Sequence, residues 1–185
     1  MIVIAMAIFT ACAGDDKQAT EPMPDEPISQ TKNSAEFNTA FATLMDNYYH
    51  LKDALVLSND TMASNSAQLL AASADSFPVS SLIGDSSIIQ LANTYFTSIA
   101  AEAKGLEGER KIDDKRRSFQ IISDNMYDLV RTVRYDREKV YHQFCPMAFN
   151  DAGGYWLSKS SDIKNPYFGK KMLTCGEVKD SLDFR

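Results

Sequence analysis

The sequence predicts an all-α fold, an up-and-down antiparallel four-helix bundle with a C-terminal irregular, β-hairpin-like cap. The first observation behind this prediction is that apolar residues recur at three- and four-residue spacings in four successive segments of residues 34–134. Such spacing marks one face of an amphipathic helix. The second is that the connections are short, which favours antiparallel neighbours. The third is that this periodicity stops near residue 138, where a stretch rich in Gly, Pro and aromatic residues begins.

The first two helices are expected between residues 34 and 74. Ser34 is a typical N-cap residue for the first helix. The apolar stripe that follows consists of Phe37, Phe41, Leu44, Met45, Tyr48, Leu51 and Leu55. The polar run Ser58-Asn59-Asp60 marks a break or a new cap. A second, alanine-rich helix is therefore predicted to follow and to end near Ala74.

The third and fourth helices are expected between residues 86 and 134. The third begins near Ser86, and Gly105 and Gly108 mark its end. The fourth begins near Lys111 and ends near Arg134. Their stripes are, in order, Ile88, Ile89, Ala92, Tyr95, Phe96, Ile99 and Ala103, then Ile112, Phe119, Ile122, Met126, Leu129, Val130 and Val133. We interpret the charged run Arg110–Arg117 as a solvated start of the fourth helix.

The last part of the folded domain, residues 138–180, is the predicted cap. Val140–Phe144 is β-branched and aromatic, which indicates a short strand. Gly153-Gly154 and Asn165-Pro166 are typical turn residues. We therefore expect an irregular, hairpin-like segment that packs on the bundle.

The N-terminal residues predict export and lipidation. Met1–Ala11 is an uncharged apolar run, too short for a membrane-spanning helix and typical of a signal-peptide core. Phe9-Thr10-Ala11-Cys12 resembles a bacterial lipoprotein box, in which the cysteine is lipid-modified and becomes N-terminal after cleavage. Residues 1–12 are thus expected to be a signal segment, with lipidated Cys12 as the anchor in the bilayer. The protein would face the periplasm or lie on the cell surface.

The composition supports a tethered domain and excludes some function classes. Residues 13–33 are polar and contain three prolines, which predicts a flexible tether before the domain of residues 34–180. The net charge of -6 argues against nucleic acid as a partner, because nucleic-acid binding needs a basic face. The sequence contains no zinc-protease motif, nucleophile elbow or dinucleotide fingerprint. We therefore predict no catalytic residues and no enzymatic activity.

Sulfur-containing side chains in the cap suggest a soft-metal site. Thiolate and thioether sulfur are soft ligands that favour Cu(I) and similar ions such as Ag(I). Cys145 and Met147 are two residues apart and would share a face in an extended segment. Met172 and Cys175 are three apart, so one turn could present both. His142 could add an imidazole.

A disulfide is the alternative use of the same cysteines. With Cys12 lipidated, only Cys145 and Cys175 remain of the three cysteines. In an exported protein these two can form a bond that closes a loop of 30 residues and contributes about 3–4 kcal/mol. The bond would consume both thiolates, leave the methionines as core fillers and stabilise a non-catalytic protein-interaction domain. The sequence leaves both uses open.

Several stretches of the chain resemble signatures of a known family. They are Tyr49–Val56 in the first helix and, in the cap, Gln143–Ala148, Gly154–Ser158, Ile163–Gly169 and Met172–Val178. Over residues 34–180 the chain resembles a domain of unknown function that occurs as stand-alone extracytoplasmic lipoproteins and appended to CusB-type periplasmic adaptor subunits of heavy-metal efflux pumps.

This resemblance implies heavy-metal handling outside the cytoplasm, with copper or silver as the natural ions and efflux-system proteins as partners. The metal ligands it implies are Cys145, Met147, Met172 and Cys175. The leading expectation is therefore a lipid-anchored metal chaperone or buffer associated with efflux.

Overall fold

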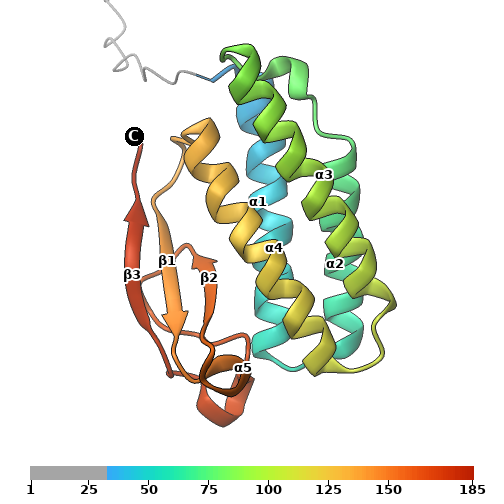
Figure 1. Ribbon diagram of the computed structural model, residues 1–185, viewed down its shortest axis with the longest axis vertical. Coiled ribbons are helices and arrows are strands. Elements are labelled where there is room, and N and C mark those ends of the chain that lie inside the picture. The colour runs from blue at the N-terminus through green and yellow to red at the C-terminus, as the bar shows by residue number, and fades with distance from the viewer. Residues whose placement is uncertain (1–32) are drawn as a thin grey trace, which may run out of the picture. The chain divides into compact units, whose positions relative to one another are not determined.

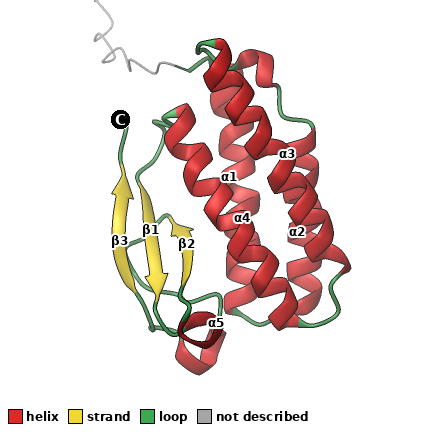
Figure 2. Cartoon of the chain, in the orientation of Figure 1, coloured by secondary structure: helices red, strands yellow, loops and turns green. Residues whose placement is uncertain are grey.

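The computed structural model describes residues 33–185. The predicted signal segment, the predicted lipidation site Cys12 and nearly all of the predicted tether lie outside these residues. The described part is mostly helical and ends in a small three-stranded antiparallel sheet (Figures 1 and 2). None of its helices is long and apolar enough to span a bilayer.

The four predicted helices are confirmed. They are α1 (Ala35–Val56), α2 (Asp60–Asp75), α3 (Ser86–Gly108) and α4 (Ile112–Val133). Three of them begin at side-chain caps: Ser34 accepts the Phe37 N–H at 3.0 Å, and Asn59 and Asp85 cap α2 and α3 in the same way. α4 ends at Arg134, which has a left-handed φ of 51°.

The helical core follows the predicted stripes. Each long helix packs against the next along the chain, and the connection from α2 to α3 contains the short 3₁₀ helix η1 (Val79–Ser81). Every residue of the predicted α1 stripe is fully buried. Phe77, which follows α2, stacks on Phe96 of α3 with ring centroids 4.0 Å apart. Apolar side chains at helical spacing therefore account for most of this core.

We predicted an all-α protein with a hairpin-like cap, but the cap is a three-stranded sheet. It contains β1 (Val140–Cys145), β2 (Gly154–Ser158) and β3 (Glu177–Leu182), in the sheet order β2-β1-β3. Both neighbours pair antiparallel with β1, so the middle strand is the first in sequence. The prediction missed β3 because only Leu182 in that strand is buried. No apolar alternation marks the strand, and pairing with β1 forms it instead.

The sheet packs on the helices through one face. Figure 1 shows it beside α4. The Tyr48 hydroxyl of α1 accepts the Leu157 N–H of β2 at 2.9 Å and lies 2.8 Å from the Ser123 hydroxyl of α4. The other face is covered by the β2–β3 connection, whose Ser160 and Asp162 carbonyls accept hydrogen bonds from the buried Gln143 side chain. This connection holds the 3₁₀ helix η2 (Gly169–Met172).

Candidate functional site in the C-terminal cap

Cys145 and Cys175 lie side by side. Cys145 is the last residue of β1 and is fully buried, whereas Cys175 precedes β3 and is half-buried. Their Sγ atoms are 2.8 Å apart and both are free thiols. This separation is longer than the bond of about 2.05 Å in a disulfide. The fully buried Asn165 holds the Cys175 end of the pair, because its side-chain amide donates to the Cys175 carbonyl at 2.8 Å.

The Cys175 thiol favours the protonated state. The hydrogen bond to Cys145, followed by burial, raises the pKa of the Cys175 thiol to about 11. A cysteine binds a metal ion or attacks as a nucleophile in its thiolate form. Reduced Cys175 therefore offers no preformed thiolate at neutral pH, and a metal would have to displace its proton to bind there.

Met147 and Met172 lie on a different feature, a pocket of about 620 Å³. We call it the α5 pocket. Its walls are the start of α4, the turn α5 (Ala148–Asp151) and η2, and neither cysteine lines it. Both methionines do, Met147 with 47% of its surface exposed. The structure thus brings the two predicted thioethers to one pocket and the two predicted thiols to another place.

His142 lies away from both cysteines. Because side chains alternate along a strand, His142 and Cys145 point to opposite faces of the sheet. The His142 ring stacks between Tyr127 of α4 at 3.8 Å and Tyr155 of β2 at 4.7 Å. Burial lowers its pKa to about 4. Within residues 33–185, no group of three or more His, Cys, Asp and Glu side chains is placed to hold a metal ion.

The turn α5 is not a regular α-helix. Phe149, Asn150 and Asp151 have left-handed φ angles of 54°, 60° and 65°. Such a conformation costs about 1–2 kcal/mol for a residue such as Phe149, whereas Asn and Asp adopt it more readily. Strain of this kind persists only where the surroundings impose it, and it concentrates at functional sites. Here a hydrogen bond of 2.9 Å from the Gly153 N–H to the Ala148 carbonyl closes the turn.

Arg116 joins the α5 pocket to the helices, although we had predicted a solvated helix start there. Its guanidinium is buried and donates to the Pro166 carbonyl at 2.9 Å, to the Ser58 hydroxyl at 2.9 Å and to Asp113 at 2.8 Å. Gly169, with a φ of 56°, has no room for a Cβ, which would lie 2.6 Å from the Ser58 hydroxyl oxygen. The end of α1, the start of α4 and η2 are thus fixed together.

Lys115 is also wrongly predicted as solvated, since it is fully buried. Its ammonium group donates to the Ser64 hydroxyl at 2.9 Å and to the Leu106 carbonyl at 3.1 Å. It also donates to the Glu109 carbonyl. Lys115 therefore satisfies carbonyls at the end of α3, whose own last turn contains no basic residue. No sequence signal separates these two cations from their solvated neighbours.

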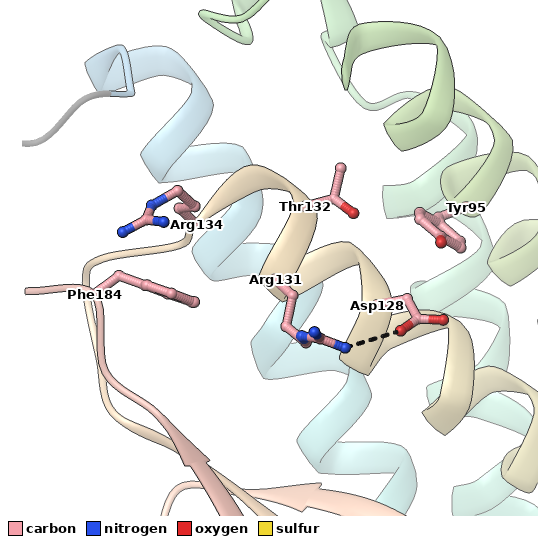
Figure 3. A pocket seen from close by; sticks show the side chains of 6 residues that line it. All are labelled: Tyr95, Asp128, Arg131, Thr132, Arg134 and Phe184. Carbon is pink, nitrogen blue, oxygen red and sulfur yellow. Dashed lines mark ion pairs between the residues drawn. The ribbon is translucent and has the colours of Figure 1, made fainter. Parts of the chain in front are cut away.

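A second hollow, of about 480 Å³, lies near the other end of α4 (Figure 3). Arg131 lines it with Asp128 at an ion-pair distance of 3.9 Å, and Arg134 lies over the Phe184 ring at 4.9 Å. None of the residues predicted as ligands lines this hollow.

One comparison with known proteins gives a match. The model of the family described as "Protein of unknown function (DUF3347)" matches residues 44–138, just over half of the chain. The protein belongs to this family. The matched range extends from within α1 to just before β1, so the cysteine pair and the α5 pocket's two methionines lie outside it. No curated protein and no solved structure matches the chain.

Proposed function

We propose that the protein is a non-catalytic, extracytoplasmic interaction domain whose cap is closed by a Cys145–Cys175 disulfide. The observation that carries this proposal is the 2.8 Å separation of the two sulfur atoms at a buried position. Oxidation would move both thiol protons and two electrons to an extracytoplasmic disulfide donor, such as a thiol–disulfide oxidoreductase.

The proposed bond suits the place where it would form. It would join the end of the central strand β1 to the segment before the exposed strand β3, across a 30-residue loop with little regular structure. In the chain-entropy model such a bond contributes about 3–4 kcal/mol. We further propose an up-and-down antiparallel arrangement of α1–α4 as the base of the cap. Lipidated Cys12 and a tether of residues 13–33 would hold this domain at the membrane.

Counting thiols in protein isolated from the extracytoplasmic compartment tests the disulfide. Cells are lysed into an alkylating agent under denaturing conditions, and the intact mass is measured before and after reduction. We expect no alkylation of Cys145 or Cys175 before reduction and alkylation of both after it. A Cys145→Ser variant is the matched control and should alkylate Cys175 without reduction. Two alkylated thiols in the unreduced native protein would refute the proposal.

Soft-metal binding is the second candidate function, as a copper or silver chaperone or buffer associated with heavy-metal efflux. Two observations favour it: the adjacent sulfurs of Cys145 and Cys175, and the placement of Met147 and Met172 on one pocket. The resemblance to extracytoplasmic lipoproteins and efflux adaptors supports the same function. The separate location of thiols and thioethers disfavours a single four-sulfur site.

Silver titration of reduced protein tests this candidate, because Ag(I) does not oxidise the thiols. Metal binding through the cysteines predicts uptake of about one equivalent that is lost in a Cys145→Ser, Cys175→Ser double variant. A Met147→Leu, Met172→Leu variant separates the thioether contribution. Uptake that is unchanged in both double variants would exclude these sulfurs as ligands.

A further inference from the structure

We propose that the α5 pocket binds an extended peptide segment in which an acidic residue stands next to large apolar side chains. This inference deepens the proposed interaction function and rests on it. It assigns the contact surface and the chemistry of the partner. The residues that carry it lie on three elements that the fold fixes together, α4, α5 and η2.

The apolar part of the pocket is open to solvent. Met147 is 47% exposed, and Phe149, Phe168 and Met172 are only half-buried. Apolar side chains gathered in one open hollow mark an interaction surface more strongly than single exposed ones do. Methionine adds a flexible, polarisable side chain that adapts to different apolar partners. The pocket thus offers contact to one or two large apolar side chains.

The charged part of the pocket favours a negative partner. Lys171 lines it, is exposed and makes no ion pair with another described residue. Arg117 also lines it and, among residues 33–185, pairs with Asp114 alone at 2.7 Å, with 69% of the Arg117 side chain exposed. A pair as exposed as this one is weak and exchangeable. Two available cations beside apolar side chains complement an acidic residue in an apolar segment.

The remaining charges do not reverse this preference. Arg116 and Asp113 offset each other at 2.8 Å, so neither is free for a ligand. Asp151 also lines the pocket and Asp114 lies beside Arg117, so three carboxylates balance three cations in this region. The preference for a negative partner therefore rests on Lys171, which no described carboxylate pairs with, and on the exchangeable pair of Arg117. These two cations disfavour a metal cation here, even though two thioethers are present.

The pocket is preorganised. Phe149 contacts Tyr167 with ring centroids 4.9 Å apart, and the buried Tyr167 hydroxyl donates to Gln120 of α4 at 2.7 Å. Met147 follows Cys145 by two residues and Met172 precedes Cys175 by three. A bond between the two sulfurs would therefore fix the separation of the two methionine-bearing walls. A fixed site loses less conformational freedom on binding than a mobile one.

The open shape favours a peptide over a small molecule or a membrane. Sites for small molecules bury most of the ligand surface, whereas Met147, Asn150 and Lys171 are all exposed along the α5 pocket. A docked peptide leaves one side in water and fits such a hollow. An anionic bilayer would have to approach a chain with a net charge of -6 through a few cations, which disfavours it.

Titration with defined peptides tests the inference. The protein is the mature chain with Cys12→Ser, exported and purified without added oxidant or reductant, which removes the predicted lipid attachment and keeps every described residue. The probe is the acetylated, amidated tetrapeptide Glu-Leu-Phe-Glu, followed by calorimetry. Its controls are Lys-Leu-Phe-Lys, which reverses the charge, and Glu-Ser-Ser-Glu, which removes the apolar pair. We expect saturable binding of the first peptide and none of the controls.

Variants locate the site. Lys171→Glu should weaken binding of Glu-Leu-Phe-Glu by about tenfold through like-charge repulsion, and Met147→Asp should abolish it. Met147 is exposed, so this change leaves the core intact. Arg131→Glu, in the hollow near the other end of α4, is the matched charge control and should leave binding unchanged. Equal binding by all three peptides, or equal loss in Lys171→Glu and Arg131→Glu, would overturn the proposal.

Two further measurements separate the possible failures. If hexanoate binds as tightly as the peptide, the occupant is a small amphiphile and the peptide proposal is wrong. Thiol counting on the same sample reports the disulfide independently. An intact disulfide without peptide binding refutes this inference alone, whereas free thiols with Lys171-dependent binding refute the disulfide alone. With both confirmed, reduction should weaken peptide binding several-fold, because the walls are then untied.

Discussion

The helices α1–α4 and the cap of residues 138–185 are stabilised by different kinds of contact. In the helices, buried apolar side chains at regular spacing fill the space between elements. In the cap, buried polar side chains make individual contacts: Gln143 and Asn165 are fully buried, and each donates to backbone carbonyls. Glycines add to this, since a Cβ on Gly154 would lie 2.6 Å from the Tyr167 ring. The stability of the helices thus depends on how well apolar side chains fill the core. The stability of the cap depends on individual hydrogen bonds and close contacts.

The largest expected effect comes from a side chain where both regions meet. Phe119 of α4 is fully buried and stacks on Tyr48 with ring centroids 5.3 Å apart. Phe119→Ala should lower the free energy of unfolding by about 4 kcal/mol, through lost burial and the cavity left behind. Urea denaturation measures the change. Ile121→Ala, on the same helix at 46% exposure, is the control and should have little effect.

A cap-specific change should have the next largest effect. Asn165→Ala removes an acceptor for the Tyr167 N–H at 2.7 Å and a donor to the Cys175 carbonyl at 2.8 Å. Because these buried groups are left without partners, we expect a loss of about 2–3 kcal/mol. Asn93→Ala, at an exposed position of the regular helix α3, is the matched control. A loss no larger than that of the control would show that the cap does not depend on single polar contacts.

The burial of His142 in its aromatic stack predicts that the stability of the folded protein depends on pH. Its pKa is lowered from 6.5 to about 4, chiefly by burial. As the pH falls below 6.5, His142 therefore binds a proton in the unfolded chain, whereas in the folded protein it does so only near pH 4. Stability should fall by about 2 kcal/mol as the pH drops through this window. His142→Phe keeps an aromatic ring at this position and should flatten this part of the pH profile in thermal melts.

A smaller change tests the hydrogen bonds that join the two regions. Tyr48→Phe removes the hydroxyl that accepts the Leu157 N–H at 2.9 Å and contacts Ser123 at 2.8 Å. We expect a loss of about 1–2 kcal/mol, because a buried N–H is left unpaired. Burial raises the pKa of this hydroxyl well above its usual range, so the effect should not vary between pH 6 and 9. Combining it with Ser123→Ala in a double-mutant cycle isolates the coupling.

The sequence predicted those features whose stabilising contacts lie within a short stretch of the chain. The stripe in α1 and its cap Ser34 lie within a few residues of what they stabilise, and they were predicted. Arg116 contacts Pro166 and Ser58, each at least 50 positions away, so no local pattern distinguishes it from a solvated cation. The left-handed turn α5 lacks a local signal for the same reason. Its conformation is set by neighbours that only the fold supplies.

The candidate site likewise combines features that the sequence predicted with features that only the fold determines. The spacing of Cys145 and Cys175 allowed either a bond or a shared metal, and the fold places the two sulfurs together. The sequence could not show that His142 lies on the opposite sheet face or that the methionines line another pocket, because these positions depend on strand register and on a strained turn.

The exposed strand β3 would have a consequence for copies of the protein if the proposed lipid anchors concentrated them on one membrane. It forms an edge of the sheet and is exposed at every position except Leu182, so its outer backbone groups could pair with a neighbouring copy. Glu177, Lys179 and Asp180 place charges along this edge. Charged edge strands resist sheet-to-sheet aggregation. On a crowded membrane surface, β3 would thus keep neighbouring copies from merging their sheets into one.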